Sequence, residues 1–465
     1  MIYSISDSEV NNYISLVRER VKGKNLKVGV ITFGCQQNER DSERILGMAV
    51  EMGYTPTDNV DSADLIIINT CAIREHAEVK ALSMLGRFKA MKKAKPELIL
   101  GVVGCMAAEE HRARMLKEDF HYVSFTLEPG MLHRIPELVA KKMIDGKRSF
   151  IFGDDNGDIY EDIPSVRASN HRAWVSIMYG CNNFCSYCIV PYVRGRERSR
   201  KSEDVIAECR SLINEGIKEI TLLGQNVNSY SDRLSFSQLL KEIAGIPGDF
   251  IVRFMTSHPK DTSPELIEVM AQYSPKIAPF FHLPLQSGSN SILKAMNRTY
   301  TREKYLDIAM SLRDRIPGIA LSTDVIVGFP GETDEDFADT MDILERVRFD
   351  NVYAFNFSPR EGTRAAKMNN SVPNEVKNKR LSHLLAVQDL ISLEKNIPFE
   401  NTVERVLVDS CELREGRNVW CGRTPTNKLV YFEGEGVSIG KYIKVKIEKA
   451  CPYHLLGSVQ EQKED

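Results

Sequence analysis

The sequence predicts two consecutive α/β domains followed by a small all-β domain, and three features of the 465-residue chain support this. Apolar runs of strand length alternate with amphipathic stretches of helix length over residues 27–147, and a second such series begins at Trp174. This alternation is typical of parallel sheets covered by helices. Beyond Pro398, short Val-, Ile- and Tyr-rich runs separated by Gly and Asn indicate a small antiparallel β-barrel.

The first series predicts a Rossmann-like parallel α/β domain. Its strands are expected at 27–33, 65–69 and 98–103, with helices at 39–52 and 75–95. Residues 153–170 are rich in Asp, Gly, Pro and Ser, which is typical of a linker. We therefore expect, in order, an N-terminal extension over 1–24, a first domain over 25–150 and a linker over 151–170.

The second series predicts a partial (βα)6 barrel over 171–397. Its six strands are expected at 174–178, 219–223, 251–255, 279–283, 320–325 and 352–355. Helices are expected between them, for example at 204–214, 264–272 and 335–346, and a long polar helix at 374–395 closes the domain. In such barrels the chemistry lies at the carboxyl ends of the strands. The third domain spans 398–462, with strands at 402–409, 418–422, 429–431, 442–449 and 455–459.

The composition indicates a globular protein that works in the cytoplasm. The hydrophobic fraction is 42% and the charged fraction is 27%. No run approaches the ~20 apolar residues that span a bilayer, and residues 1–24 lack the apolar core of a secretory signal. In a reducing compartment, clustered cysteines indicate metal binding or catalysis rather than disulfides. Because the net charge is only −3, any surface for nucleic acid has to be local.

Cys181, Cys185 and Cys188 form a C-x3-C-x2-C loop directly after the first expected strand of the second domain. A loop this short lets three thiolates converge on one cluster, and three ligands for four irons leave one iron open. Structural zinc needs a closed set of four ligands, and no fourth Cys or His stands at a suitable spacing. Ferredoxin-type carriers use four cysteines per cluster. The remaining alternative is three incidental cysteines, and the pattern favours a [4Fe–4S] cluster.

Cys35, Cys71 and Cys105 each follow the carboxyl end of an expected strand in the first domain. In a parallel sheet those ends lie along one edge, where ligands bind. Each cysteine alone is more simply interpreted as a buried core residue, because free Cys is commonly buried. Three of them at equivalent positions predict a second three-thiolate cluster, also with an open iron.

The other four cysteines are interpreted as ordinary core or surface residues. Cys209 lies in an expected helix, and the rest lie in the β-rich tail, namely Cys411, Cys421 and Cys451.

Six motifs give the chain a resemblance that covers residues 27–459. They are Gly34–Asn38, Thr70–Glu75, Gly180–Cys185, Ile189–Arg200, Leu223–Tyr230 and Val327–Thr333. The cysteine loop, with Tyr187 before its last Cys, resembles the signature of radical S-adenosylmethionine (SAM) enzymes. A three-cysteine first domain, a radical-SAM domain and a small tail barrel together resemble the methylthiotransferases, whose tail is an RNA-binding TRAM domain. The blocks 181–200 and 224–230 are most similar to the branch that acts on N(6)-isopentenyladenosine in tRNA.

The resemblance implies two [4Fe–4S] clusters and SAM as cofactors. SAM on the Cys181/Cys185/Cys188 cluster would give the radical that removes hydrogen from carbon 2 of the adenine beside the anticodon. The Cys35/Cys71/Cys105 cluster would carry the sulfur, which a first SAM methylates. Tyr187 would lie against the SAM adenine. Gly permits close backbone approach and polar side chains hydrogen-bond SAM, so the candidates at strand ends are Gly224, Gln225, Asn226, Ser257, His258, Gln286, Ser287, Gly288 and Asp324. The alternative for each is an ordinary turn or capping residue.

Two basic clusters are candidates for phosphate contacts. The stretch 79–96 contains basic residues and no acidic ones, namely Lys80, Arg87, Lys89, Lys92, Lys93 and Lys95; the alternative is a solvated helix face. The second cluster comprises Arg194, Arg196, Arg198, Arg200 and Lys201. In the tail, the candidates are Arg423, Lys428 and Lys444, which would read exposed loop bases.

The expected partners are tRNA carrying N(6)-isopentenyladenosine, a one-electron reductant of flavodoxin or ferredoxin type, and an iron–sulfur or sulfur donor protein. A monomer without membrane contact is expected. Two alternatives stay open within the family: action on threonylcarbamoyl-adenosine in tRNA, or on a ribosomal-protein aspartate. A non-enzymatic alternative is an RNA-binding iron–sulfur sensor.

Overall fold

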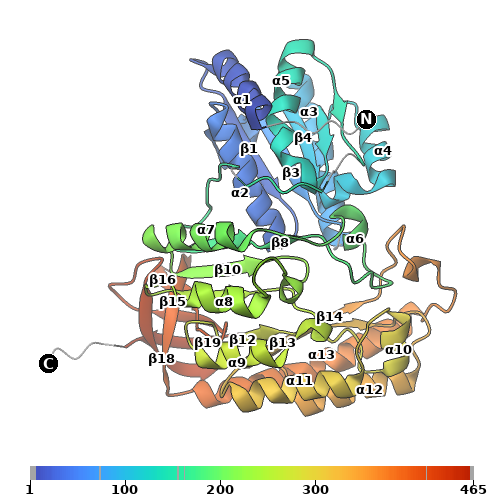
Figure 1. Ribbon diagram of the computed structural model, residues 1–465, viewed down its shortest axis with the longest axis vertical. Coiled ribbons are helices and arrows are strands. Elements are labelled where there is room, and N and C mark those ends of the chain that lie inside the picture. The colour runs from blue at the N-terminus through green and yellow to red at the C-terminus, as the bar shows by residue number, and fades with distance from the viewer. Residues whose placement is uncertain (1–6, 73–74, 154–156, 162, 415, 461–465) are drawn as a thin grey trace. The chain divides into compact units, whose positions relative to one another are not determined.

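The computed structural model describes residues 7–72, 75–153, 157–161, 163–414 and 416–460 (Figure 1). The chain divides into two compact units. The first comprises residues 1–168, 178–182 and 188–200, and the second comprises 169–177, 183–187 and 201–465. Each unit is described by itself. None of the described helices is long and apolar enough to cross a membrane.

The first unit is built on a six-stranded parallel sheet in the order β2-β1-β3-β4-β5-β6. The strands are β1 (Lys27–Thr32), β2 (Thr55–Pro56), β3 (Leu65–Thr70), β4 (Ile99–Gly104), β5 (Phe125–Leu127) and β6 (Ser149–Phe150). Every residue of β3 and β4 is buried, as expected for apolar strands covered by helices on both faces. The predicted parallel α/β domain is confirmed.

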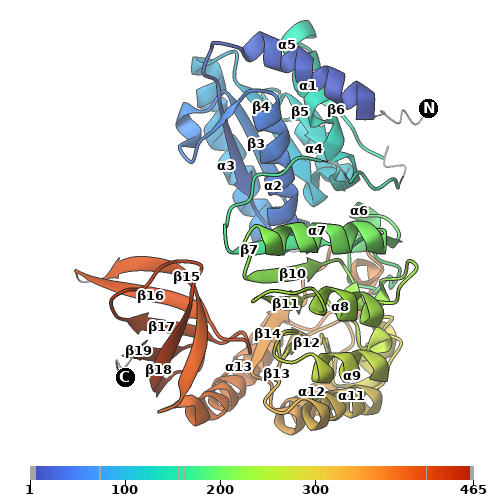
Figure 2. The same ribbon diagram turned by 60° about the vertical axis from the view of Figure 1, so that its left-hand side comes forward.

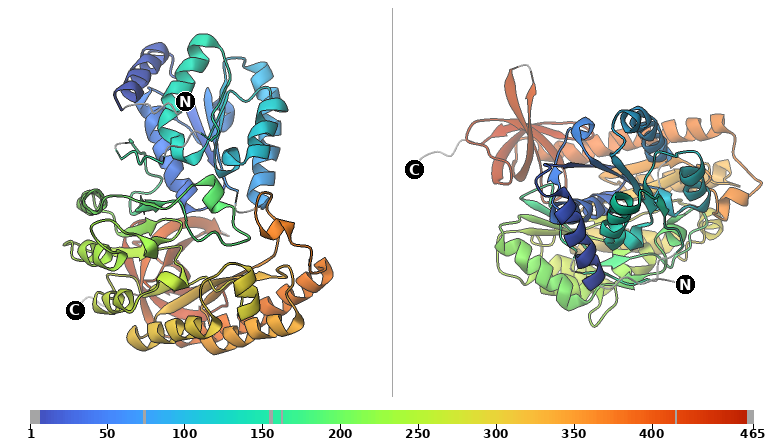
Figure 3. Two further views of the ribbon diagram at one scale, coloured as in Figure 1. Left: turned by 45° about the vertical axis from the view of Figure 1, so that its right-hand side comes forward. Right: turned by 90° about the horizontal axis from the view of Figure 1, so that it is seen from above.

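Helices cover both faces of this sheet (Figure 3). They are α1 (Asp7–Val21), α2 (Gln36–Glu51), α3 (Glu75–Ala94), α4 (Glu110–Glu118) and α5 (Ile135–Asp145). The segment 1–24, which carries no recognised motif, contributes α1 to the core. Ile14, Val17 and Val21 share one helix face and are buried in the same hydrophobic cluster as Leu138 of α5. A short hairpin of β8 (Met178–Tyr179) and β9 (Arg198–Ser199), with helix α6 (Val190–Val193), completes the unit.

The second unit contains the predicted partial barrel. Its six strands are β7 (Arg172–Ser176), β10 (Glu219–Leu223), β11 (Ile251–Phe254), β12 (Phe280–His282), β13 (Ala320–Val327) and β14 (Asn351–Asn356). They form two parallel three-stranded sheets, β11-β10-β7 and β12-β13-β14. An isolated parallel bridge joins Val252 of β11 to Ile277, which precedes β12. Strand order in space therefore follows the order in the chain, as in a barrel that does not close.

Helices alternate with these strands. They are α7 (Ser202–Asn214), α8 (Phe236–Ala244), α9 (Pro264–Gln272), α10 (Asn290–Ala295), α11 (Arg302–Arg315), α12 (Asp334–Val347) and α13 (Asn374–Asn396). Strand β13 continues two residues beyond the predicted end at Val325. The predicted strand 320–325 already contained Asp324, and the longer β13 places this residue in the middle of the strand, which corrects its expected place at a strand end.

The tail forms a closed barrel in the order β15-β16-β17-β19-β18 (Figure 2). Its strands are β15 (Val403–Arg414), β16 (Arg417–Arg423), β17 (Leu429–Glu433), β18 (Tyr442–Ala450) and β19 (Leu455–Val459). Four of the five pairs are antiparallel, whereas β17 and β19 are parallel. A closed ring with an odd number of strands cannot alternate direction throughout, so one parallel pair is unavoidable. The barrel itself is confirmed.

Candidate cluster and cofactor sites

The cysteines of the first unit lie at the carboxyl ends of three neighbouring strands. Cys35 follows β1 and caps α2, Cys71 follows β3, and Cys105 follows β4 and begins a short 3-10 turn. Because β1, β3 and β4 are adjacent in the sheet, the three positions share one edge. Cys71 and Cys105 are each only 1% exposed, and Cys35 is half-buried.

Two glycines let these strand ends approach one another. A Cβ on Gly34 would lie 2.9 Å from the Cβ of Cys71, so the backbone beside Cys35 packs directly against Cys71. Gly104, which precedes Cys105, has φ +97°, and a Cβ there would lie 2.4 Å from the carbonyl oxygen of Thr70. Only glycine fits both positions.

A buried amide pair ties α2 to the end of β3. Asn38 Nδ2 donates to Asn69 Oδ1 and to the Thr70 carbonyl oxygen, both at 3.0 Å, and Asn69 Nδ2 donates to the Asn38 carbonyl oxygen at 2.8 Å. The Cys35 thiol donates to Asn38 Oδ1 at 3.3 Å. These hydrogen bonds, all made between protein groups, hold Cys35 beside Cys71.

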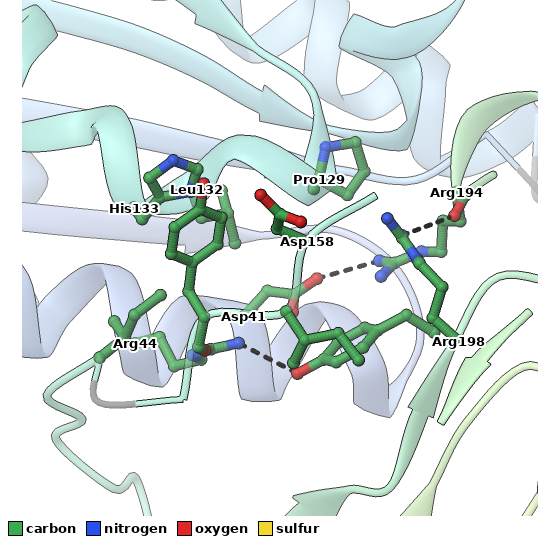
Figure 4. A pocket seen from close by; sticks show the side chains of 13 residues that line it. Asp41, Arg44, Pro129, Leu132, His133, Asp158, Arg194 and Arg198 are labelled. Atoms are coloured by element: carbon green, nitrogen blue, oxygen red, sulfur yellow. Dashed lines mark hydrogen bonds and ion pairs between the residues drawn. The ribbon is translucent and has the colours of Figure 1, made fainter. Parts of the chain in front are cut away.

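Arg194 is buried next to Cys105 rather than exposed for RNA. Its Nη2 donates to Asp41 Oδ2 at 3.0 Å (Figure 4). Its Nε donates to Cys105 Sγ at 3.2 Å. Burial lowers the pKa of Arg194, but Cys105, Asp41 and Cys35 raise it more, so it stays charged. Burial raises the pKa of Cys105 to about 12; Arg194 opposes this rise, while Cys71 and Cys35 add to it. The three thiols are therefore close enough to interact electrostatically.

The three cysteines have the chemistry of cluster ligands, because iron–sulfur clusters bind through thiolates. Across the described part of the chain, no group of three or more His, Cys, Asp or Glu side chains is arranged to hold one metal ion. The thiolates of a cluster bind different irons, so they need not converge on one point. Buried sulfurs, a nearby cation and a hydrogen-bond donor are the surroundings that tune such clusters.

Cys181 and Cys188 of the C-x3-C-x2-C loop belong to the first unit. The Cys181 N–H donates to the Gly195 carbonyl oxygen at 3.1 Å, so the chain after the loop folds back on it. Gly180 has φ +75°, and a Cβ there would lie 1.9 Å from the Arg196 carbonyl oxygen. Cys181 is 8% exposed and Cys188 is half-buried.

Cys185 belongs to the second unit and is 9% exposed. Asn297 Nδ2 donates to the carbonyl oxygens of Asn183 and Phe184 at 3.1 and 3.0 Å. Phe184 has φ +45°, a conformation that costs energy in a non-glycine residue and persists only when its surroundings hold it. Arg298 Nη1 lies 3.5 Å from Cys185 Sγ. Sequence reasoning missed both Asn297 and Arg298.

The predicted SAM residues lie in the second unit, and two of them carry buried atoms without a partner. Asn226 Oδ1 and Ser257 Oγ are buried and accept or donate no hydrogen bond. Asn226 Nδ2 donates to Asp261 Oδ2 at 2.7 Å, which fixes the direction of Oδ1. Because buried polar atoms in native proteins are normally satisfied, these two fit a polar ligand such as SAM.

Backbone strain marks the same strand ends. Thr256, at the end of β11, has φ +65° and donates its hydroxyl to the Gly224 carbonyl oxygen. Gln286, after β12, has φ +68° and pairs with β13 through an isolated bridge to Val325. A β-branched residue at positive φ is unusual, and such outliers cluster at functional sites. Sequence reasoning missed Thr256, because a positive φ at a threonine cannot be recognised from the sequence.

His258 lies near these groups and stays neutral. Its Nδ1 accepts a hydrogen bond from the Lys260 N–H at 3.2 Å. Burial lowers the pKa of His258 to about 2, helped by the charges of Arg298 and Lys260. The imidazole can therefore accept a hydrogen bond but carries no charge near neutral pH.

Several predicted RNA contacts are corrected by burial. Besides Arg194, Arg200 is 8% exposed and donates to Glu161, and the side chain of Lys428 is 9% exposed and pairs with Asp350. Lys92 donates its ammonium to the carbonyl oxygens of Pro96 and Leu98. These groups already have partners, so phosphate contacts are not expected from them. Lys80, Lys89, Lys93, Arg196, Lys201 and Lys444 are exposed, whereas Arg198 and Arg423 are half-buried.

The remaining observations concern the other cysteines and one motif. No disulfide joins any of the ten cysteines, all of which lie in the described part of the chain; Cys209 is buried in α7, and Cys411, Cys421 and Cys451 are half-buried in the barrel. Ile73 and Arg74 of the Thr70–Glu75 motif lie outside the described residues.

Comparison with known families matches three regions of the chain. The Radical SAM superfamily matches residues 175–344, the TRAM domain matches 399–459, and the Uncharacterized protein family UPF0004 matches 27–127. Among solved structures, the radical SAM methyltransferase TsrM from Kitasatospora setae, with cobalamin and a [4Fe-4S] cluster bound, has a TM-score of 0.55. It shares 12% identity and covers 73% of this chain and 74% of its own, which supports the fold alone.

Curated relatives are much more similar. The tRNA-2-methylthio-N(6)-dimethylallyladenosine synthase of Acetivibrio thermocellus is 47% identical over 95% of this chain and 93% of its own length. The protein of the same name from Alkaliphilus oremlandii is 48% identical over 94% and 93%. The fold and the cysteine loop define a radical-SAM enzyme, a class that uses SAM and a [4Fe–4S] cluster. Within that class, the chain belongs to the family of tRNA-2-methylthio-N(6)-dimethylallyladenosine synthases.

Proposed function

We propose that this chain is a tRNA methylthiotransferase that attaches sulfur and a methyl group to carbon 2 of N(6)-isopentenyladenosine beside the anticodon. One observation carries the proposal: two separate cysteine triplets stand in a chain whose relatives, at 44–48% identity, are named for this reaction. Cys181, Cys185 and Cys188 would hold the cluster that binds SAM, and Cys35, Cys71 and Cys105 would hold the cluster that carries sulfur.

When bound, SAM and its cluster supply a one-electron cleavage that yields a radical strong enough to remove an unactivated aromatic hydrogen. The chain's own residues position the reactants. Asn226 and Ser257 would give their unpartnered oxygens to SAM, and Thr256 fixes the Gly224 carbonyl beside them. Gln225, Gln286, Ser287 and Tyr187 stay candidate SAM contacts.

An exposed face of β13 and β14 is suited to the target base. Asp324 pairs in register with Tyr353, and Ile326 pairs with Phe355, so these four side chains share one face. Tyr353 and Phe355 are 44% and 51% exposed, which is unusual for aromatic residues on a sheet. Tyr353 and Phe355 would stack on the purine, and Ile326 would contact the isopentenyl group. The Asp324 carboxylate, whose Oδ2 lies 3.3 Å from His282 Nε2, would accept the N(6)–H hydrogen bond through its other oxygen.

This base-binding face has a direct test. Stacking on an aromatic ring contributes ~1–3 kcal/mol per base, so Phe355→Ala should raise KM for the modified tRNA roughly 5- to 150-fold. Iron content should not change. Leu390→Ala, at a side chain that is 64% exposed on helix α13 and outside the barrel, is the matched control and should leave KM unchanged. Equal KM values for the two variants would show that β14 is not part of the substrate site.

The reaction itself is tested with reconstituted protein, SAM, a one-electron reductant and tRNA carrying isopentenyladenosine. Mass analysis of the nucleosides should show the methylthio product, and Cys35→Ala should abolish it while still forming 5′-deoxyadenosine. Product formation only on threonylcarbamoyl-tRNA or on the ribosomal protein would transfer the assignment to another branch. An iron–sulfur sensor would form no 5′-deoxyadenosine at all.

The other expectations stay proposals. They are a cytoplasmic monomer, a flavodoxin- or ferredoxin-like reductant, a sulfur or cluster donor protein, and domain limits of 25–150, 171–397 and 398–462. For RNA contacts, we retain the exposed Lys89, Lys93, Arg196 and, in the barrel, Lys444.

A further inference from the structure

Arg298 is a buried cation whose surroundings differ from those of the other buried arginines. It follows helix α10 and is 8% exposed. Its Nη2 donates to the Pro284 carbonyl oxygen at 2.8 Å and its Nε to Tyr300 Oη at 3.0 Å. Its Nη1 donates to Cys185 Sγ at 3.5 Å, and the guanidinium carbon lies 5.0 Å from the centre of the Tyr300 ring.

No carboxylate neutralises this charge. Among the described residues, every other buried arginine has an Asp or Glu oxygen within 4 Å, whereas Arg298 has none; the paired arginines are Arg134, Arg194, Arg200, Arg253 and Arg380. A buried charge without a counter-charge costs several kcal/mol, so natural proteins pair it or use it. His258, which faces the guanidinium, is neutral and gives no compensation.

The sulfur of Cys185 is the group on which this charge can act. The other groups near the guanidinium are the Pro284 carbonyl and the phenols of Tyr300 and Tyr187, and all of them are uncharged near neutral pH. A cysteine that ligates iron is a thiolate, and the cluster it holds gains one negative charge each time it accepts an electron. The missing counter-ion of Arg298 is thus supplied by a cluster on Cys185.

We propose that Arg298 is the charge-balancing residue of the SAM-binding cluster and raises its reduction potential, which makes the cluster easier to reduce. The inference rests on the proposed cluster at Cys181, Cys185 and Cys188. It assigns Arg298 a positioning and electrostatic role rather than contact with reacting atoms. Stabilisation of the reduced, more negative cluster by a hydrogen-bonded cation is one of the ways in which a protein sets such potentials.

Asn297 separates the effect of charge from that of shape. It lies beside Arg298 and holds the Asn183 and Phe184 carbonyls, so it positions the same loop without bringing a charge. Arg302 is the matched control for loss of a cation, because it begins the next helix, α11, and is already neutralised by Asp339 and Asp342.

The test is a redox titration of the full chain, followed by electron paramagnetic resonance. Cys35, Cys71 and Cys105 are changed to Ala so that only one cluster titrates. Arg298→Gln should lower the ratio of reduced to oxidised cluster at least tenfold at a fixed potential, which is a shift of 59 mV for one electron. Arg298→Lys should retain most of the potential, while Asn297→Ala and Arg302→Gln should leave it unchanged.

An unchanged potential in Arg298→Gln would overturn the proposal. If that variant fails to hold a cluster, iron content in Arg298→Lys decides: retention supports charge balance, and equal loss refutes it. Neither SAM nor tRNA takes part in this titration. A failure of the proposed methylthiotransferase function would therefore appear in the nucleoside assay and leave the potential unaffected.

Discussion

The buried ion pair between Arg194 and Asp41 offers a sharp test of how the first unit is held together. Their side chains are 5% and 4% exposed and 3.0 Å apart, and the same guanidinium donates to Cys105 Sγ. Changing Arg194 to Gln leaves the Asp41 carboxylate buried without its cation. It also removes the donor from a sulfur that we assign to a cluster.

The structure sets the size of the effect. Removing one partner of a buried pair costs ~3–5 kcal/mol, because the other charge stays behind in a poorly solvated site. The pair Arg18–Glu51 in the same unit is a matched control. Its side chains are 52% and 51% exposed, so Arg18→Gln should cost only ~0–1 kcal/mol. With a urea m-value of ~1–3 kcal/mol per molar, a loss of 3 kcal/mol lowers the midpoint by at least about 1 M.

The assay uses the placement of the two tryptophans. Trp174 and Trp420 both belong to the second unit, so their fluorescence follows that unit, whereas circular dichroism follows both. In iron-free, reduced protein, Arg194→Gln should lower the urea midpoint of the unfolding transition that circular dichroism detects and tryptophan fluorescence does not. The double variant Asp41→Asn with Arg194→Gln should recover part of the loss.

A cost for Arg194→Gln no larger than that for Arg18→Gln would refute the buried pair. Such a result would indicate that Arg194 is exposed, as the basic pattern of the sequence predicted.

Three further predictions concern iron and pH. Gly180→Ala should lower iron per chain by about half, because its Cβ would lie 1.9 Å from the Arg196 carbonyl oxygen. Gly216→Ala is the control, since Gly216 also has a positive φ but a Cβ there would meet nothing within 4 Å. This variant should lose ~1–2 kcal/mol of stability and keep its iron. His258 has a folded pKa of about 2 against an ordinary 6.5, so the unfolded state binds the extra proton. The contribution of His258 to the free energy of unfolding is full above about pH 6.5 and falls as the pH decreases toward 2. Across that pH range, the stability of His258→Gln, followed by tryptophan fluorescence, should depend less on pH than that of the wild-type protein. Cys209→Ser, in the core of α7, should lower stability by ~1–3 kcal/mol without loss of iron; a drop in iron would show that the interpretation of Cys209 as a core residue is wrong.

The fold was readable in the sequence wherever local patterns decide structure. Apolar strands such as Leu65–Thr70 are buried on both faces, and their alternation with helices fixes parallel pairing. The strand-end positions of Cys35, Cys71 and Cys105 follow from that pattern. The parallel β17–β19 pair was missed although five strands were predicted, because it depends on which strands are neighbours in the closed ring, and no single segment reveals that order.

The surroundings of the candidate sites could not be read in this way. Arg194 contacts Asp41 across 153 positions, and Arg298 contacts Cys185 across 113. A run of arginines looks the same in sequence whether its members are solvated or buried. Burial depends on tertiary packing, so the sequence predicted a phosphate surface where the structure has an ion pair.

The central claim is that each cysteine triplet holds its own [4Fe–4S] cluster. The most direct measurement is iron and acid-labile sulfide per chain after anaerobic reconstitution. Wild-type protein should contain ~8 irons, and ~4 should remain when either Cys35, Cys71 and Cys105 or Cys181, Cys185 and Cys188 are changed to Ala. A wild-type content of ~4 irons that only one of the two triple variants abolishes would contradict the account.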